Sequence, residues 1–209
     1  NPARGSYHNC CPDYHPVCAP PSPPPPPPTN PPPPPGPGMP GHLEWTNNFG
    51  PGTSGSAIDT AACVVRNGMV YFTSAGSRWT VYAVDATTGD HRWNWTMSAI
   101  SSTTAVTADD KSVYFATSSN TRNSGVTLYA LDGATGKPRW SRALDGGEVL
   151  DHPTVADGVV YAIFGEGYSN SHVTQKTFHA VEAASGKVLW STNVTGSGTA
   201  PTVSGTTVV

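Results

Sequence analysis

The chain has 209 residues, of which only 12% are charged, and its formal net charge is −3. A weakly acidic chain with few lysines and arginines has no basic surface for nucleic acid. No apolar run approaches the length of a membrane span, so we expect no such span. Because 18 of the 22 prolines fall within the first 40 positions, we expect the folded core to come from residues 41–209.

Residues 1–19 form a cysteine-containing segment with the pattern Cys-Cys-Pro-x-x-x-Pro-Val-Cys, made by Cys10, Cys11 and Cys18. The pattern resembles the end of a granulin-type cysteine module. Dense cysteines predict disulfides and a secreted, extracellular location. Cys63 is the fourth candidate, and it either pairs with one of the three or stays buried and reduced; four cysteines allow three pairings.

Zinc is an alternative for this segment, because His8 and His15 lie near the cysteines, but their spacing matches no ordinary zinc finger. We therefore predict no metal and no cofactor here. The chain begins at Asn1 rather than Met and ends inside a predicted strand, so we expect it to be processed or to be part of a longer protein.

Residues 20–40 are a proline-rich linker. Proline fixes φ and has no N–H, so this stretch is predicted to be a polyproline II spacer. A serine followed by prolines resembles the extensin-like, hydroxyproline-rich wall glycoproteins, which implies hydroxylation and O-glycans. The candidate positions are Ser22, Pro23, Pro24, Pro25, Pro26, Pro27, Pro28, Thr29, Pro31, Pro32, Pro33, Pro34 and Pro35. A proline-rich ligand for an SH3-type domain is the alternative.

Residues 41–209 read as short alternating strands separated by turns, which predicts an all-β fold. A leftover strand at 43–46 comes first and carries Trp45. Three units of four strands follow, and residues 200–209 open a fourth unit. The predicted strands are 62–66, 69–73, 79–84 and 91–96; 104–107, 112–116, 126–131 and 138–140; and 153–156, 159–164, 177–181 and 188–190.

Three copies of one phrase, Ala-x-(Asp/Glu)-x-x-(Thr/Ser)-Gly-x-x-x-Trp, start at Ala83, Ala130 and Ala180. A period of 47 to 50 residues is typical of a β-propeller or another repeat array. In each copy the acid and the glycine suit a hairpin turn. Burying the tryptophan of the next strand is worth roughly 4–6 kcal/mol before entropy is subtracted. The predicted docking residues are Trp45, Trp93, Trp140, Trp190, Gly89, Gly136 and Gly186.

The phrase resembles the tryptophan-docking motif of the pyrroloquinoline-quinone-like propellers, a family of quinone-dependent dehydrogenases and non-catalytic scaffold lipoproteins. The resemblance implies a β-propeller of four-stranded blades in which each tryptophan packs on the turn of the neighbouring blade. About four blades are visible. The last one is completed either by further sequence or by a neighbouring chain.

An enzyme of this type needs a catalytic aspartate and a calcium site of carboxylate and amide oxygens. The candidate acids are Asp109, Asp110, Asp145, Glu148 and Asp151. Solvent-exposed carboxylates in turns explain these residues better than a catalytic or calcium-binding role does. A further set of acids occupies equivalent places in the repeats and is predicted to be structural: Asp85, Asp132 and Glu182. His152 and His179 have no partner at ligand spacing.

Asn94 and Asn193 begin N-glycosylation sequons, and strand alternation points both away from the docked tryptophan. Taken together, these features predict a secreted structural or adhesive glycoprotein of a cell surface, wall or fibril, which is not an enzyme. Its partners are expected to be further copies of itself and covalently attached glycans. The alternatives are part of a quinone-dependent dehydrogenase, or a monomeric propeller that binds carbohydrate or protein.

Overall fold

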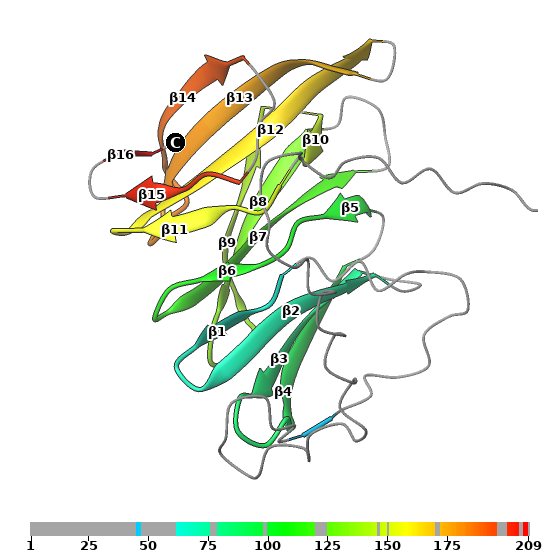
Figure 1. Cartoon of the computed structure of the whole chain (residues 1–209), viewed down its shortest axis with the longest axis vertical. Coiled ribbons are helices and arrows are strands. Elements are labelled where there is room, and N and C mark those ends of the chain that lie inside the picture. The colour runs from blue at the N-terminus through cyan, green and yellow to red at the C-terminus, as the bar shows by residue number, and fades with distance from the viewer. Residues whose placement is uncertain are drawn as a thin grey trace, which may run out of the picture. The chain divides into compact units, whose positions relative to one another are not determined.

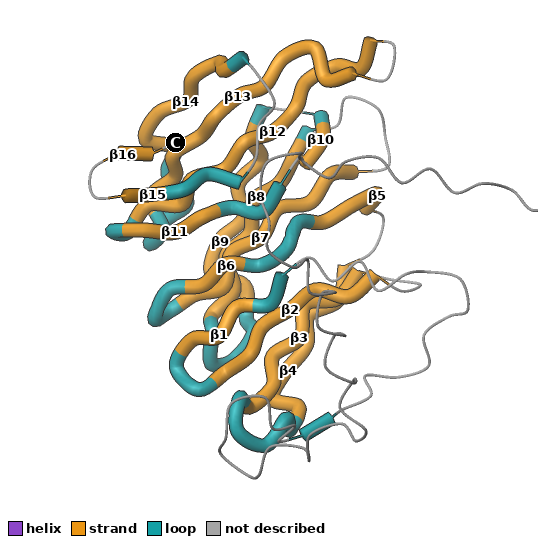
Figure 2. The backbone as a smooth tube through the Cα atoms, viewed as in Figure 1, coloured by secondary structure: helices purple, strands orange, loops and turns teal. Residues whose placement is uncertain are grey.

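A computed structural model describes residues 45–46, 62–75, 79–97, 100–119, 125–145, 147–149, 151–169, 172–195, 200–204 and 207–208. All described elements are strands, joined by turns and loops (Figures 1 and 2). The chain divides into two units, Asn1–His42 and Leu43–Val209, and the described residues belong to the second. The prediction of an all-β propeller is confirmed.

The first blade is a four-stranded antiparallel sheet in the order β1-β2-β3-β4. Its strands are β1 (Val64–Arg66), β2 (Met69–Ala75), β3 (Trp79–Asp85) and β4 (His91–Met97). Asn67 and Gly68 join β1 to β2 with φ values of 50° and 73°. Such positive φ at both central residues belongs to the two-residue hairpin turn that Asn-Gly favours.

The second blade repeats this plan, but its first strand is in two pieces that both pair with β7. Its strands are β5 (Ile100–Thr103), β6 (Thr107–Ala108), β7 (Ser112–Ser119), β8 (Val126–Asp132) and β9 (Pro138–Leu144). The predicted strand at 104–107 is therefore wrong, because most of it is the link between β5 and β6. There Thr104 Oγ1 accepts the Ala116 N–H at 3.0 Å, in place of a strand carbonyl.

The third blade also has a divided first strand, and its two longest strands form an extended hairpin. Its strands are β10 (Glu148–Val149), β11 (Thr154–Ala156), β12 (Val159–Ser169), β13 (His172–Glu182) and β14 (Val188–Val194). A two-stranded sheet, β15 (Val203–Ser204) and β16 (Thr207–Val208), follows. It begins the predicted fourth unit.

The core lies between consecutive blades. Tyr71, Val81 and Trp93 of the first blade pack on Phe115 and Leu131 of the second. The second core cluster joins the second blade to the third through residues such as Leu128, Val160 and Phe164. Strand alternation explains this, because successive side chains face opposite neighbours and both faces of a middle blade are covered.

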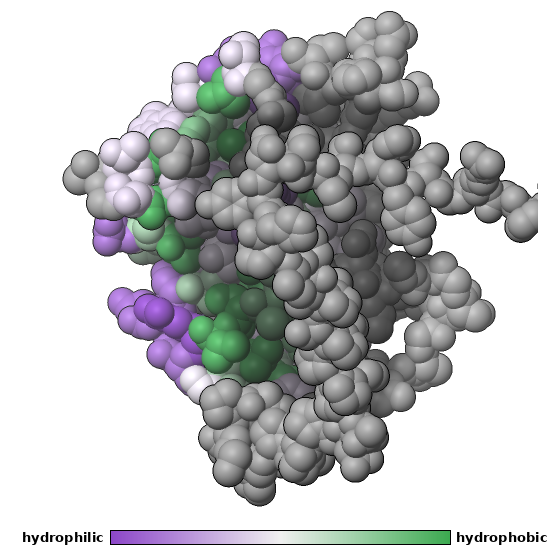
Figure 3. Space-filling view, viewed as in Figure 1, coloured by the Kyte–Doolittle hydropathy of each residue, from purple (hydrophilic) through white to green (hydrophobic). Residues whose placement is uncertain are grey.

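The predicted strand at 43–46 is not seen in its described part, because Trp45 and Thr46 are not in a strand. Elsewhere the predicted strands agree with the observed ones to within a few residues, and the largest differences are the extra lengths of β12 and β13. Figure 3 shows apolar surface over β1 and β2, where Val65 is 60% exposed. The cysteine-containing segment and the proline-rich linker lie outside the described residues.

Candidate functional site

Tryptophan packing joins each blade to the next. The indole of Trp93 lies on Gly136, and its Nε1 donates to the Gly133 carbonyl at 2.9 Å. Trp140 packs in the same way on Gly186 and donates to Ala183 O at 2.9 Å. A Cβ on Gly136 would come within 2.6 Å of the Trp93 ring, so only glycine fits there.

Trp45 makes the same contact with the first blade. Its Nε1 donates to the Ala86 carbonyl at 3.1 Å, and its ring covers Gly89. Trp190 differs, because no glycine-bearing turn among the described residues packs on it. Its side chain contacts Tyr161 and Phe178, with ring centroids 6.3 Å and 5.4 Å away, and it is 44% exposed.

The acids of the repeated phrase hold their own turns together. Asp85 accepts the N–H groups of Thr87 and Thr88 at 2.9 Å and 3.0 Å, and it pairs with Arg92 at 2.7 Å. The Arg92 hydrogen bond, followed by these two backbone donors, lowers the pKa of Asp85 to about 2. Hydrogen bonding from Thr135 likewise lowers the pKa of Asp132.

Glu182 accepts a hydrogen bond from Ser185 and occupies the equivalent place in the third blade. Together with Asp85 and Asp132, it therefore stabilises a turn.

Asp109 and Asp110 lie in the hairpin between β6 and β7, as the sequence predicts. Asp109 accepts the Lys111 and Ser112 N–H groups, both at 2.8 Å, and the Tyr114 hydroxyl at 2.8 Å. Asp110 pairs with Arg66 of the first blade at 2.8 Å. Both carboxylates are therefore engaged in structural contacts.

The other candidate acids lie between β9 and β11. Asp151 accepts the His152 N–H and the Ala200 N–H at 2.7 Å and 2.8 Å, and it pairs with the His152 ring at 2.7 Å. The Asp145 side chain is exposed and lines a pocket. Glu148 begins β10, and its side chain lies outside the described part of the chain.

These acids do not fit a quinone and calcium site in the part of the chain that the structure describes. No group of three or more His, Cys, Asp or Glu residues there could hold a metal ion. Asp109, Asp110 and Asp151 already accept the hydrogen bonds and ion pairs given above. Asp145, by contrast, is exposed and lines a pocket, but no metal-holding group of these residue types accompanies it among the described residues.

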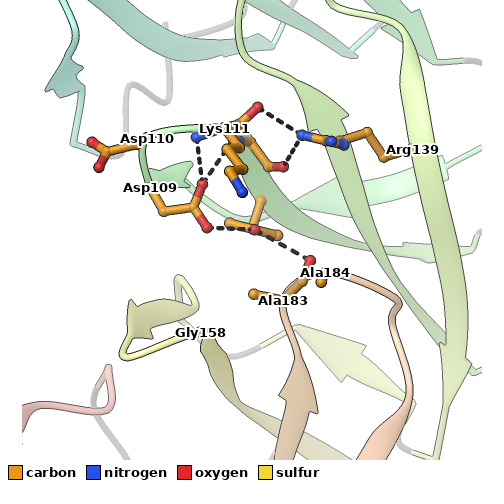
Figure 4. A pocket seen from close by; sticks show the side chains of 9 residues that line it. Asp109, Asp110, Lys111, Arg139, Gly158, Ala183 and Ala184 are labelled. Atoms are coloured by element: carbon orange, nitrogen blue, oxygen red, sulfur yellow. Dashed lines mark hydrogen bonds between the residues drawn. The ribbon is translucent and has the colours of Figure 1, made fainter.

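Equivalent clefts occur at the two described blade junctions. The cleft between the second and third blades has a volume of about 350 Å³ (Figure 4). The cleft between the first and second blades measures about 290 Å³. In the first of these, the Tyr114 hydroxyl donates to Asp109 and is also 3.3 Å from Ala183 O, and Arg139 donates to Lys111 O and Ser112 Oγ at 3.2 Å.

Tyr71 takes the place of Tyr114 in the smaller cleft, where its hydroxyl donates to Gly133 O at 3.1 Å. Burial raises the pKa of both tyrosines above the usual range. Tyr71 thus donates across its junction, whereas Tyr114 donates to Asp109 of its own blade and lies close to the Ala183 carbonyl of the next blade.

Sequence reasoning missed an arrangement on the third blade. His179 is only 1% exposed, and its Nδ1 lies 2.8 Å from the exposed Ser191 Oγ. Its Nε2 lies 3.0 Å from the Asp145 carbonyl oxygen. The available signal was a histidine at the repeat position where the other blades have Tyr82 and Tyr129. His152 is half-buried beside Asp151 and does not join this group.

Asn94 and Asn193 have exposed side chains on the outer strands β4 and β14. Glycan attachment at either site stays a prediction. Cys63 is exposed and forms no disulfide within the described part of the chain, so the expectation that a reduced Cys63 would be buried is wrong. Cys10, Cys11, Cys18 and the candidate O-glycosylation positions lie outside the described residues.

The stacked four-stranded blades and their tryptophan contacts define a quinoprotein-type β-propeller. The family model described as outer membrane protein assembly factor BamB, of pyrroloquinoline-quinone-like repeats, matches residues 39–125 and 80–174. Because the two matches together cover more than half of the chain, the protein belongs to this family. No curated protein sequence matches the chain.

Two solved structures with TM-scores of 0.50 and 0.53 agree with this fold, and a third has a lower TM-score. Quinohemoprotein alcohol dehydrogenase ADHIIG of Pseudomonas putida HK5 is 22% identical, with a TM-score of 0.50 over 66% of this chain and 21% of its own. The computationally designed Ika8 protein is 16% identical, with a TM-score of 0.53 over 71% and 41%. BamB from Moraxella catarrhalis is 18% identical, with a TM-score of 0.41 over 73% and 52%. The chain thus spans about half or less of each structure.

The predicted role as a structural or adhesive glycoprotein of a wall or fibril is wrong. Family membership places the chain among BamB-like and quinoprotein propellers, which favours the alternatives that the sequence left open. The granulin-like and extensin-like resemblances receive no support, since the family match begins at residue 39. A secreted location stays a prediction. The described residues include no helix able to cross a membrane.

Proposed function

We propose that the chain is a protein-binding part of a quinoprotein-type propeller, related in function to the assembly factor that describes its family. The observation that carries the proposal is the aromatic face on the third blade, where the exposed Trp190 packs against the half-buried rings of Tyr161 and Phe178 and follows the exposed Leu189 in β14. Leu189 is 46% exposed and Trp190 is 44% exposed, whereas Trp93 is 7% exposed. Large side chains of this kind are enriched at the centres of protein interfaces.

The packing within the chain indicates what this face would bind. Trp45, Trp93 and Trp140 each lie on a glycine of a tight turn and donate Nε1 to a carbonyl of that turn. The Trp190 indole has the same place in its blade and the same donor. We therefore propose that it binds a glycine-bearing hairpin turn of a polypeptide.

A calorimetric titration tests this proposal. The ligand is a cyclised hairpin peptide with the sequence of residues 126–144, which contains the turn on which Trp93 packs. We expect saturable binding to the whole chain and at least about tenfold weaker binding to the Trp190→Ala variant, as for an interface anchor.

The matched control is the same peptide with Gly136→Ala, whose Cβ would collide with an indole placed as Trp93 is. We expect it to bind much more weakly. Equal binding of the two peptides, or binding unchanged by Trp190→Ala, would contradict the proposal.

The second candidate is part of a quinone-dependent dehydrogenase. It is supported by the fold likeness to the Pseudomonas putida alcohol dehydrogenase. The test is addition of pyrroloquinoline quinone and Ca²⁺, followed by dye reduction with ethanol or glucose. Turnover would favour the dehydrogenase, whereas peptide binding without turnover would favour the protein-binding role.

A further inference from the structure

The third blade holds a serine, a histidine and a carbonyl in one hydrogen-bonded series. Ser191 lies on β14 directly opposite His179 of β13. The Ser191 Oγ to His179 Nδ1 distance is 2.8 Å, and the His179 Nε2 to Asp145 O distance is 3.0 Å. Ser191 is exposed while His179 is 1% exposed, so solvent reaches the hydroxyl and the packed ring has a fixed position.

The carbonyl partner determines the tautomer of the ring. A carbonyl oxygen can only accept, so His179 Nε2 must carry the hydrogen that it donates to Asp145 O. In the neutral ring Nδ1 is then an acceptor, and the Ser191 hydroxyl must donate to it. A hydroxyl that donates to an oriented imidazole is the arrangement that activates a serine nucleophile.

The other blades lack this arrangement. Tyr129 lies opposite Ser141 in the second blade, and Tyr82 lies opposite Asn94 in the first. Packing therefore does not require histidine at this place in the repeat, since tyrosine occupies it twice. Ser141 is exposed, like Ser191, but has no imidazole opposite it, which makes it an internal control.

A pocket opens at Ser191. It has a volume of about 550 Å³ and is lined by Asp145, Thr177, Ser191, Thr192 and Asn193. The Thr177 hydroxyl donates to Asn193 Oδ1 at 3.3 Å, which turns the amide nitrogen of Asn193 away from Thr177. The lining is polar and includes one carboxylate, so it suits small, polar, uncharged molecules better than anions or long acyl chains.

We propose that Ser191 is a nucleophile that takes the acyl group from small uncharged carboxylic esters, with His179 as its general base. Ser191 Oγ forms a bond to the ester carbonyl carbon as its proton moves to His179 Nδ1. The bond to the alcohol oxygen breaks, and the alcohol leaves with the proton from His179. Water then attacks the acyl-serine by the same proton path, which releases the acid and restores Ser191.

The surrounding groups have defined roles in this step. The Asp145 carbonyl holds the ring through Nε2–H and stabilises the imidazolium that forms, as the third member of a catalytic triad does. The Asn193 amide, on the same face of β14 as Ser191, is the donor in the pocket for the developing carbonyl oxyanion. The site lies apart from the aromatic face of Trp190 and is independent of the proposed protein binding.

Covalent labelling of the whole chain tests the proposal. The probe is diisopropyl fluorophosphate, which is uncharged and transfers its phosphoryl group to an activated serine with loss of fluoride. We expect one label per chain, at Ser191 by peptide mapping, at a rate at least about 100-fold above that of Ser141, since a positioned base contributes about 10²–10⁴-fold. Hydrolysis of p-nitrophenyl acetate should be lost with the label.

The variants separate activation from simple exposure. Ser191→Ala should abolish labelling and hydrolysis, whereas Ser141→Ala should leave both unchanged. His179→Gln should reduce both at least about 100-fold, the lower bound for a lost general base. His179→Tyr, which copies the second blade, provides a second test if the glutamine variant does not fold. No label at Ser191, equal labelling of Ser141, or full labelling in a folded His179 variant would overturn the proposal.

Discussion

Replacing Gly136 by alanine tests the view that tryptophan contacts hold the blades together. Gly136 has φ +69°, and a Cβ there would lie 2.6 Å from Cδ2 and Cε3 of Trp93. The left-handed backbone costs alanine about 1–2 kcal/mol. Forcing the buried indole aside adds about 1–3 kcal/mol, as overpacking of a core does. We therefore expect Gly136→Ala to lower the free energy of unfolding by about 2–5 kcal/mol.

Gly158→Ala is the matched control, because Gly158 has φ +76° but a Cβ at this position would meet nothing within 4 Å. It should cost only the backbone term of about 1–2 kcal/mol. Urea unfolding, followed by circular dichroism and tryptophan fluorescence, measures both values. In a Trp93→Ala background, Gly136→Ala and Gly158→Ala should lower the free energy of unfolding by the same amount, because the indole that the new Cβ would meet is gone. Equal costs in the wild-type background would refute the reasoning.

Three further predictions concern the buried tryptophan, the acid of a turn and a tyrosine hydroxyl. Trp93→Ala should lower the free energy of unfolding by about 3–5 kcal/mol, because it removes a buried aromatic side chain. Trp190→Ala should lower it by at most about 2 kcal/mol, because that side chain is exposed. Urea midpoints in the reverse order would contradict this account of the packing. The pKa of Asp85 is lowered to about 2, against about 3.9 in an unfolded chain, so its contribution to stability is present above pH 4 or so and is lost as the pH falls toward 2. Asp85→Asn should flatten the fall in urea midpoint between these pH values, and an unchanged slope would exclude this role. Tyr114→Phe removes the hydroxyl bonded to Asp109 and should cost about 1 kcal/mol in the same assay, whereas a neutral result would show that the bond contributes nothing.

Much of the fold could be predicted from the sequence because its determinants are local. Asn67-Gly68 and Asp157-Gly158 make their turns wherever they occur between alternating strands, and positive φ is observed at all four residues. The division of the first strand of the second blade at Thr104 could not be predicted. It depends on the Thr104 hydroxyl, which replaces a strand carbonyl as the acceptor for the Ala116 N–H. The alternation of apolar and polar residues does not predict such a replacement.

The repeating blades, their hairpins and the tryptophan phrase follow from residues close together in the chain, since turn chemistry and side-chain alternation act over a few residues. Which distant groups meet depends on how the blades pack. The ion pair of Arg66 with Asp110 joins residues 44 positions apart, and His179 reaches a carbonyl 34 positions away. Trp93 and Trp190 occupy the same place in the repeat, yet one is covered by a turn and the other is exposed. Burial of a side chain depends on which distant segment packs against it, and the residues near it in the sequence do not predict that segment.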